Sequence, residues 1–128
     1  MSVITVLRQA DIFFELTSTQ LELIASICKE RHYQAGDYIF EENTPGDELY
    51  VIANGEVEIQ VNPALLGKDK HGGPQTIATL RRGQSFGEIA LVDEGLRSAS
   101  ARCAQQETRL MVIPREKLML LCDTYPQL

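Results

Sequence analysis

The chain has 128 residues, a length that suits one domain able to bury a hydrophobic core without metals or disulfides. Its 18 acidic and 12 basic residues give a formal net charge of −6, which argues against unaided binding of nucleic acid. No stretch approaches the ~20 apolar residues of a transmembrane helix, so we expect no membrane insertion and a cytoplasmic location.

Cysteine and histidine are the residue types that would most readily mark a metal or redox site. Cys28, Cys103 and Cys122 are widely spaced, which favours reduced thiols, and we expect Cys28 and Cys122 on the apolar faces of helices. His32 and His71 lie too far apart to suggest a metal pair. The sequence also shows no pairing of a nucleophile with a base, so we expect no metal, no cofactor and no enzymatic activity.

A helix is predicted to begin at Thr17. Thr17 and Gln20 have the spacing of a capping box, and Leu16 and Leu21 occupy the hydrophobic staple positions around it. The apolar face of this helix carries Leu21, Ile24, Ala25 and Cys28.

From Gly36 to Arg109 the hydrophobic period changes to two, which predicts strands. The clearest case alternates Val57, Ile59 and Val61 with Glu56, Glu58 and Gln60. Asn54-Gly55 before it has the composition of a hairpin turn. Several short strands separated by Gly and Pro favour a sandwich or barrel.

The run from Asn62 to Gln75 contains two prolines and three glycines, which is typical of a loop between strands. We interpret its lysines, Lys68 and Lys70, as solvated in preference to guiding an anion, and assign this loop no function.

The segment that begins at Phe86-Gly87-Glu88 and continues through Arg97 has the features of a phosphate site. A helical turn opened by glycine presents backbone N–H groups to an anion, and the planar guanidinium of Arg97 can hold two phosphate oxygens. A phosphate repels Glu88, so we expect Glu88 to accept from a hydroxyl such as a ribose 2′-OH. The predicted ligand is therefore a nucleotide. The candidate binding residues are Phe86, Gly87, Glu88, Ile89, Ala90, Arg97, Ser98 and Ala99.

A purely structural interpretation of the same residues is an alternative. Ser85 and Glu88 also fit a capping box, and Arg97 is within reach in sequence of Asp93 and Glu94 for a surface ion pair. No capping rule, however, requires an arginine nine residues after the glutamate, so we favour the phosphate site.

A final helix is predicted to begin near Pro114, because proline suits a first helical turn, and to end at Tyr125-Pro126. It presents Leu118, Leu121 and Cys122 to the core.

The segment from Phe86 to Ala101 resembles the phosphate-binding cassette of the cyclic nucleotide-binding domain family. This family includes catabolite-activator-type regulators and the regulatory subunits of cyclic-AMP-dependent kinase. Ile113 to Leu128 resembles the helix that follows the cassette in the family, so nearly the whole chain is covered. The family's glycine-punctuated strands resemble Ala35-Gly36-Asp37-Tyr38-Ile39-Phe40, Pro45-Gly46-Asp47, Leu49-Tyr50-Val51-Ile52 and Asn54-Gly55-Glu56-Val57.

The resemblance implies a mainly β fold with flanking α-helices. Its specific form is an eight-stranded antiparallel jelly-roll barrel, or double-stranded β-helix, between an N-terminal and a C-terminal helix. We expect residues 1–128 to form a single domain that lacks the long C-terminal lid helix and effector domain of many relatives. The chain would then be a free-standing sensor or a fragment of a longer protein.

The implied function is a non-catalytic sensor that binds cyclic AMP or cyclic GMP and moves its terminal helices, with a protein effector in cis or in trans. Ser98 is compatible with either nucleotide, and Ile39 and Ile77 are candidates for contact with the base. A degenerate docking module with little nucleotide affinity is the alternative. A cupin-type enzyme has little support, because it would need a cluster of histidines.

Overall fold

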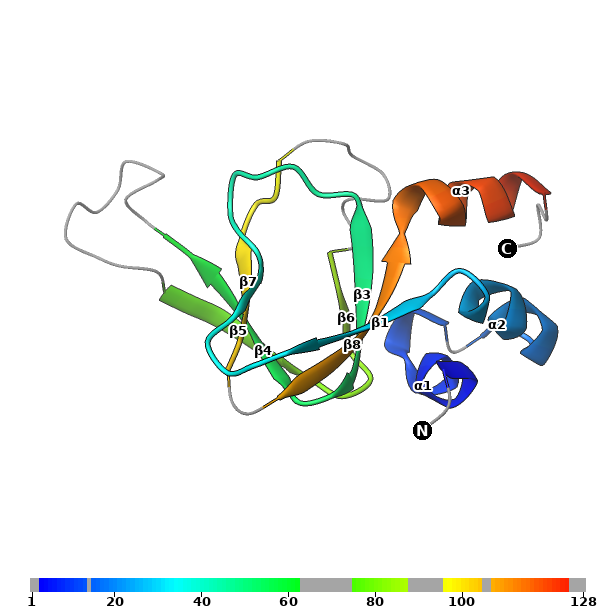
Figure 1. The fold of residues 1–128 in the computed structure, drawn as a ribbon, viewed down its shortest axis with the longest axis horizontal. Helices are drawn as coiled ribbons and strands as arrows, with labels where there is room; N and C mark the ends of the chain where they lie inside the picture. The colour runs from blue at the N-terminus through cyan, green and yellow to red at the C-terminus, as the bar shows by residue number, and fades with distance from the viewer. Residues whose placement is uncertain (1–2, 14, 63–74, 88–95, 105–106, 125–128) are drawn as a thin grey trace.

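The computed structural model describes residues 3–13, 15–62, 75–87, 96–104 and 107–124, which form two facing sheets with helices gathered at one end (Figure 1). In the first sheet the strand order is β1 (Lys29–Tyr33), β8 (Thr108–Pro114), β3 (Glu48–Asn54) and β6 (Ser85–Phe86). In the second it is β2 (Tyr38–Phe40), β7 (Ser100–Cys103), β4 (Glu56–Val61) and β5 (Gln75–Arg81). Every strand pair is antiparallel, which confirms the prediction of a mainly β fold with flanking helices.

The helical elements lie beside the first sheet (Figure 1). They are α1 (Val3–Gln9), the 3₁₀ turn η1 (Asp11–Phe13), α2 (Ser18–Ala25) and α3 (Arg115–Thr124). The helix α1 was not predicted from the sequence, and it packs against α2 and β3. Val6 and Leu7 supply its buried face.

The helix α2 begins as the sequence predicts. Thr17 is the N-cap and forms a complete capping box with Gln20, with distances of 3.2 Å from the Gln20 N–H to Thr17 Oγ1 and 2.9 Å from the Thr17 N–H to Gln20 Oε1. The helix ends at Ala25, so the expectation that Cys28 lies on its apolar face is wrong. Cys28 follows the helix, where its thiol donates to the Ile24 carbonyl and packs against the core.

The strands β3 and β8 are buried on both faces, so the two faces belong to two cores. The core between the helices and the first sheet contains Val6, Leu7, Ala10, Phe13, Leu21, Ile24, Leu49, Val51, Ala53, Met111 and Ile113. The core between the two sheets contains Tyr50, Ile52, Val57, Phe86, Ala101, Leu110 and Val112. Successive residues of one strand thus stabilise different layers of the fold.

The turn at Asn54-Gly55 does not form the predicted hairpin. β3 belongs to the first sheet and β4 to the second, so in the described structure the chain crosses between sheets at this turn. Gly55 has a φ of 101°, and a Cβ there would lie 2.4 Å from Thr108 Oγ1. Glycine is required at this position both by the backbone conformation and by the packing of β8.

The alternation predicted for β4 breaks near its end. Val57 is buried, whereas Ile59 and Val61 are only half-buried and Gln60 is buried instead. The pairing of β4 with β5 shifts register between Ile59 and Gln60, and such a bulge turns the following side chain to the other face. The amide of Gln60 donates to Thr76 Oγ1 and accepts from the Tyr38 hydroxyl, which satisfies its polar atoms.

The helix α3 follows β8 directly, because Pro114 is the last residue of that strand. Leu118 packs against the core between the helices and the first sheet, as predicted, while Leu121 and Cys122 are half-buried. None of the side chains of α3 is fully buried, whereas α1 and α2 each bury two side chains. In the predicted loop from Asn62 to Gln75, residues 63–74 lie outside the described residues and Gln75 begins β5.

Candidate ligand-binding site

Arg97 is buried between two segments that are distant in sequence, with only 8% of its surface exposed. Its backbone N–H donates to the Thr44 carbonyl at 2.8 Å, and its own carbonyl accepts from the Asn43 N–H at 2.8 Å. Pro45 and Leu96 form an isolated antiparallel bridge beside these bonds. The turn before β3 therefore fixes the backbone from which the Arg97 side chain projects.

The guanidinium of Arg97 lies between the two sheets. Its Nη1 donates to the Gly87 carbonyl at 3.3 Å and its Nη2 donates to the Glu48 carbonyl at 3.0 Å. Its Cζ is 4.1 Å from the centroid of the Phe40 ring and 5.8 Å from that of Tyr50. Among the described residues, the Arg97 side chain is therefore buried on backbone carbonyls and aromatic rings, while Asp93 and Glu94, the candidate partners for a surface ion pair, lie outside the described residues.

Within the described part of the chain, the guanidinium has donors to spare. It carries five N–H groups, and Arg97 Nε is buried without a hydrogen-bond partner. A buried donor without a partner costs about 1–3 kcal/mol, and native structures leave few of them. A buried cation with unused donors is suited to receive an anionic ligand.

Gly87 is constrained by both conformation and space. Its φ is 82°, and a Cβ there would lie 2.9 Å from the Glu48 carbonyl oxygen and 3.0 Å from Arg97 Nη1. Glycine therefore allows the chain to pass close to the guanidinium. The preceding residue, Phe86, is buried and stacks on Tyr50 with ring centroids 5.0 Å apart. This stacking anchors the chain at the point where it reaches Gly87.

The structure brings together only part of the predicted site. Phe86, Gly87 and Arg97 converge, Ser98 is exposed and Ala99 is half-buried. Glu88, Ile89 and Ala90 lie outside the described residues. The Ser85 hydroxyl, considered for a capping box, donates to Asp11 Oδ1 at 2.9 Å and joins β6 to η1.

The two base-contact candidates occupy different environments. Ile39 packs against the core between the sheets. Ile77 is 64% exposed on β5.

Glu48 binds Arg97 through its backbone carbonyl, while its carboxylate pairs with Arg31 and Tyr50. The carboxylate accepts both Nη groups of Arg31, at 3.0 and 2.9 Å, and the Tyr50 hydroxyl at 2.8 Å. Burial raises the pKa of Tyr50, and the bond to Glu48 raises it further, so the phenol stays a donor. Because Arg31 neutralises this carboxylate, its repulsion of an anion beside Arg97 is reduced.

Sequence reasoning missed four residues that surround Arg97, namely Phe40, Gly46, Glu48 and Tyr50. The motif Pro45-Gly46-Asp47 was identified only as one of the segments that resemble the family's glycine-punctuated strands. Nothing in its local pattern indicated that the turn would pack against an arginine some fifty positions later.

An open pocket of about 520 Å³ adjoins this turn. It is lined by Pro45, Gly46 and Asp47 on one side and by Arg115 and Glu116 of α3 on the other. The Arg115 N–H donates to the Asp47 carbonyl at 2.7 Å. The turn that packs against Arg97 is thus hydrogen-bonded directly to the start of α3.

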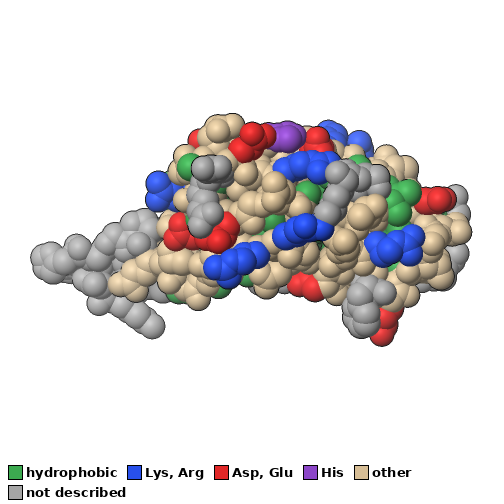
Figure 2. Space-filling view, turned by 90° about the horizontal axis from the view of Figure 1, so that it is seen from below, with side chains coloured by type: hydrophobic (Ala, Val, Ile, Leu, Met, Phe, Trp, Pro, Cys, Tyr) green, Lys and Arg blue, Asp and Glu red, His purple; other side chains and the backbone are tan. Residues whose placement is uncertain are grey.

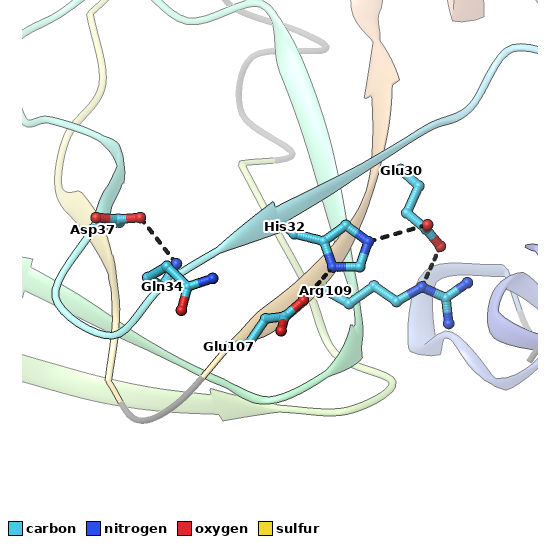
Figure 3. A network of polar contacts seen from close by, with 6 residues as sticks. All are labelled: Glu30, His32, Gln34, Asp37, Glu107 and Arg109. Atoms are coloured by element: carbon cyan, nitrogen blue, oxygen red, sulfur yellow. Dashed lines mark hydrogen bonds and ion pairs between the residues drawn. The ribbon is translucent and has the colours of Figure 1, made fainter.

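A separate network of charged side chains joins β1 to the start of β8 (Figure 3). His32 Nδ1 is 2.6 Å from Glu107 Oε1 and its Nε2 is 3.2 Å from Glu30 Oε2, while Arg109 donates to Glu30. The bonds to Glu107 and then Glu30 raise the pKa of His32. The bonds from His32 and then Arg109 lower the pKa of Glu30. The pairs are exposed, so this network mainly links strands at the surface.

On the face shown in Figure 2, basic and acidic side chains of the described residues are interspersed, and these residues form no basic patch there of the kind that binds nucleic acid. Among the described residues, no group of three or more His, Cys, Asp or Glu side chains is arranged to hold a metal ion. Of the helices in the described ranges, none is both long and apolar enough to cross a membrane.

Comparison with known proteins gives consistent matches. The family model for the cyclic nucleotide-binding domain matches residues 30–125. Human cGMP-dependent protein kinase 2 is 30% identical over 122 residues, which are 95% of this chain and 15% of the kinase. The cyclic AMP receptor protein of Thermus thermophilus is 33% identical over 120 residues, which are 94% of this chain and 52% of that protein. The chain therefore spans about half or less of these two relatives.

Among solved structures, the N-terminal domain of a transcriptional regulator from Streptomyces coelicolor superimposes with a TM-score of 0.83 at 26% identity, covering 95% of this chain and 80% of that one. The family model covers the strands of both sheets apart from Lys29 of β1, and it covers Arg97 and all of α3. The chain belongs to the cyclic nucleotide-binding domain family.

Proposed function

We propose that this chain is a non-catalytic regulatory module that binds cyclic AMP or cyclic GMP, with the phosphate held by Arg97 and the backbone after Gly87. The observation that carries the proposal is the buried Arg97 guanidinium, which lies against Gly87 and retains an unpartnered Nε–H. A permanently charged planar group with unused donors suits the two exocyclic oxygens of a cyclic phosphate. The names of the kinase and of the receptor protein point to the same ligand class.

The remaining cassette residues take complementary roles in this proposal. Backbone N–H groups of Glu88, Ile89 and Ala90 donate to the phosphate, and the Glu88 carboxylate accepts from the ribose 2′-OH. Ser98 and Ala99 complete the phosphate side. Phe86 anchors the cassette through its stacking on Tyr50.

Ligand binding is coupled to α3 in this proposal. The Asp47 carbonyl accepts from the Arg115 N–H, so a shift of the turn around Gly46 moves the start of α3. With no fully buried side chain, α3 can change position at low cost. A cytoplasmic protein effector, in cis or in trans, would read this movement. We take residues 1–128 as one domain of this module and the two sheets as the two halves of a jelly-roll barrel.

Calorimetry with cyclic AMP, cyclic GMP and the non-cyclic control 5′-AMP tests the function. We expect one cyclic nucleotide per chain and weaker binding of 5′-AMP. Arg97→Ala should weaken binding about ten- to a hundredfold, because a charge-assisted bond is worth roughly 1.5–3 kcal/mol. If neither cyclic nucleotide at millimolar concentration gives heat or thermal stabilisation, the proposal of a sensor is wrong and a docking module of the same fold is favoured.

The role of Glu88 has its own test. If Glu88 accepts from the 2′-OH, Glu88→Gln should bring the affinities for cyclic AMP and 2′-deoxy cyclic AMP closer together. If the wild type binds the two equally, Glu88 does not contact the ribose.

A further inference from the structure

Arg97 is held by groups from both sheets. The Phe40 ring, at the end of β2, belongs to the second sheet, whereas the Glu48 carbonyl begins β3 and Gly87 follows β6 in the first. The ring centroid is 4.1 Å from Cζ of Arg97, well inside the range of about 6 Å for a cation–π contact. The ring of Tyr50, at 5.8 Å, is near the limit of that range.

The two carbonyls alone leave one degree of freedom open. Each accepts from a different Nη of Arg97, so the two bonds fix one edge of the guanidinium but allow its plane to tilt about that edge. The face of the Phe40 ring restrains this tilt, because the cation is attracted to the centre of the ring. The orientation of the unpartnered Nε–H therefore depends on Phe40.

The Phe40 ring is itself fixed by other rings. Its centroid is 5.7 Å from that of Tyr50 and 6.0 Å from that of Phe86, and Tyr50 and Phe86 stack on each other. Tyr50 and Phe86 are buried, and the half-buried Phe40 ring packs against both of them, which restricts its orientation. Phe40 thus provides a fixed surface against which the guanidinium plane of Arg97 is held.

We propose that Phe40 is a positioning residue for Arg97, and that the negative face of its ring sets the affinity of the site for the cyclic phosphate. This inference rests on the proposed function. A guanidinium held in one plane binds two phosphate oxygens with less loss of conformational entropy. Because Arg97 is desolvated, its attraction to the ring is stronger than that of an exposed pair.

Fluorination of Phe40 separates this role from simple packing. Replacing Phe40 by 4-fluoro-, 3,5-difluoro- and pentafluorophenylalanine nearly preserves the shape of the ring and progressively removes its negative face. Affinity for cyclic AMP or cyclic GMP should fall stepwise, by roughly three- to tenfold over the series. Equal or higher affinity across the series would overturn the proposal.

One matched background and three further variants complete the experiment. In Arg97→Gln the same fluorination series should change affinity by less than about twofold, because the cation is gone. Phe40→Tyr should retain most of the affinity that Phe40→Leu loses, and Leu80→Val, in the same core, should lower thermal stability without changing affinity. Wild-type protein that binds neither nucleotide overturns both proposals. Binding that requires Arg97 but ignores fluorination overturns only the role of Phe40.

Discussion

Gly46 lies against Arg97 so closely that no side-chain atom fits between them. A Cβ on Gly46 would be 1.8 Å from Nε and 2.3 Å from Cζ of Arg97. The position of the buried guanidinium therefore depends on the absence of a side chain at a residue that is remote in sequence.

Gly46→Ala should displace Arg97 and break its bonds to the Glu48 and Gly87 carbonyls. We expect unfolding to become easier by about 1–3 kcal/mol and nucleotide affinity to fall about tenfold or more. Urea unfolding and calorimetry give the two values. Gly36→Ala is the matched control, because its φ of 89° makes alanine strained there while the added atom meets only Arg102. The control should lose stability and keep affinity. Wild-type affinity in Gly46→Ala would show that binding does not use this arginine position.

Arg97→Lys should weaken nucleotide binding by about tenfold or more although it conserves the charge. A lysine ammonium is a point charge, so it cannot reproduce the planar contacts with two carbonyls and the Phe40 ring. Arg102→Lys is a close control, since Arg102 also donates to a backbone carbonyl, that of Gly36, and lies near an aromatic ring, that of Tyr38. Titration with cyclic nucleotide should show a loss only for Arg97→Lys. Equal losses in both variants would indicate a general effect on the fold.

Glu48→Gln should reduce stability more than it reduces binding. The substitution removes the charge that pairs with Arg31, and we expect about 1 kcal/mol because the pair is partly exposed. The backbone carbonyl that holds Arg97 is unchanged, so the affinity should stay within about threefold of wild type. Glu56→Gln, which weakens a more exposed pair with Arg81, should be nearly neutral in urea unfolding. A large loss of affinity in Glu48→Gln would mean that the carboxylate, too, positions the guanidinium.

The network around His32 should make stability depend on pH. The pKa of His32 is raised in the folded protein, so its contribution is present below the unfolded value and is lost as the pH rises through the folded value. Glu30 has a lowered pKa and acts in the opposite sense, contributing above its unfolded value and losing that contribution as the pH falls through the folded value.

His32→Gln should therefore be less stable than wild type at mildly acidic pH and equal to it at alkaline pH. Unfolding by urea between pH 5 and pH 9 measures the difference, which we expect to be small because the group is exposed. If the free energy of unfolding differs between the two proteins by the same amount at every pH, the effect comes from packing and not from titration of His32.

The features that the sequence determined by itself are those set by neighbours along the chain. Thr17 and Gln20 are three residues apart, so the capping box of α2 follows from local composition alone. The segment from Phe86 to Ala101 likewise indicated the family without any tertiary information, and the family match confirms it. The helix α1 was missed because its stability comes from packing Val6 and Leu7 on other elements and not from a local cap.

Tertiary structure decided the features that depend on partners chosen across the fold. Asn54-Gly55 has hairpin composition, yet β3 pairs with β8 and β6, and β4 pairs with β5 and β7. The bulge before Gln60 exists only in the pairing with β5. From the sequence alone, Arg97 fits both a surface ion pair and a phosphate-binding residue, although the pattern around it favours the second. Arg97 is buried against Phe40, Gly46 and the Glu48 carbonyl because the fold places the end of β2 and the start of β3 beside it. Such contacts join residues about fifty positions apart, and no local pattern records them, because only the packed core determines which side chains meet.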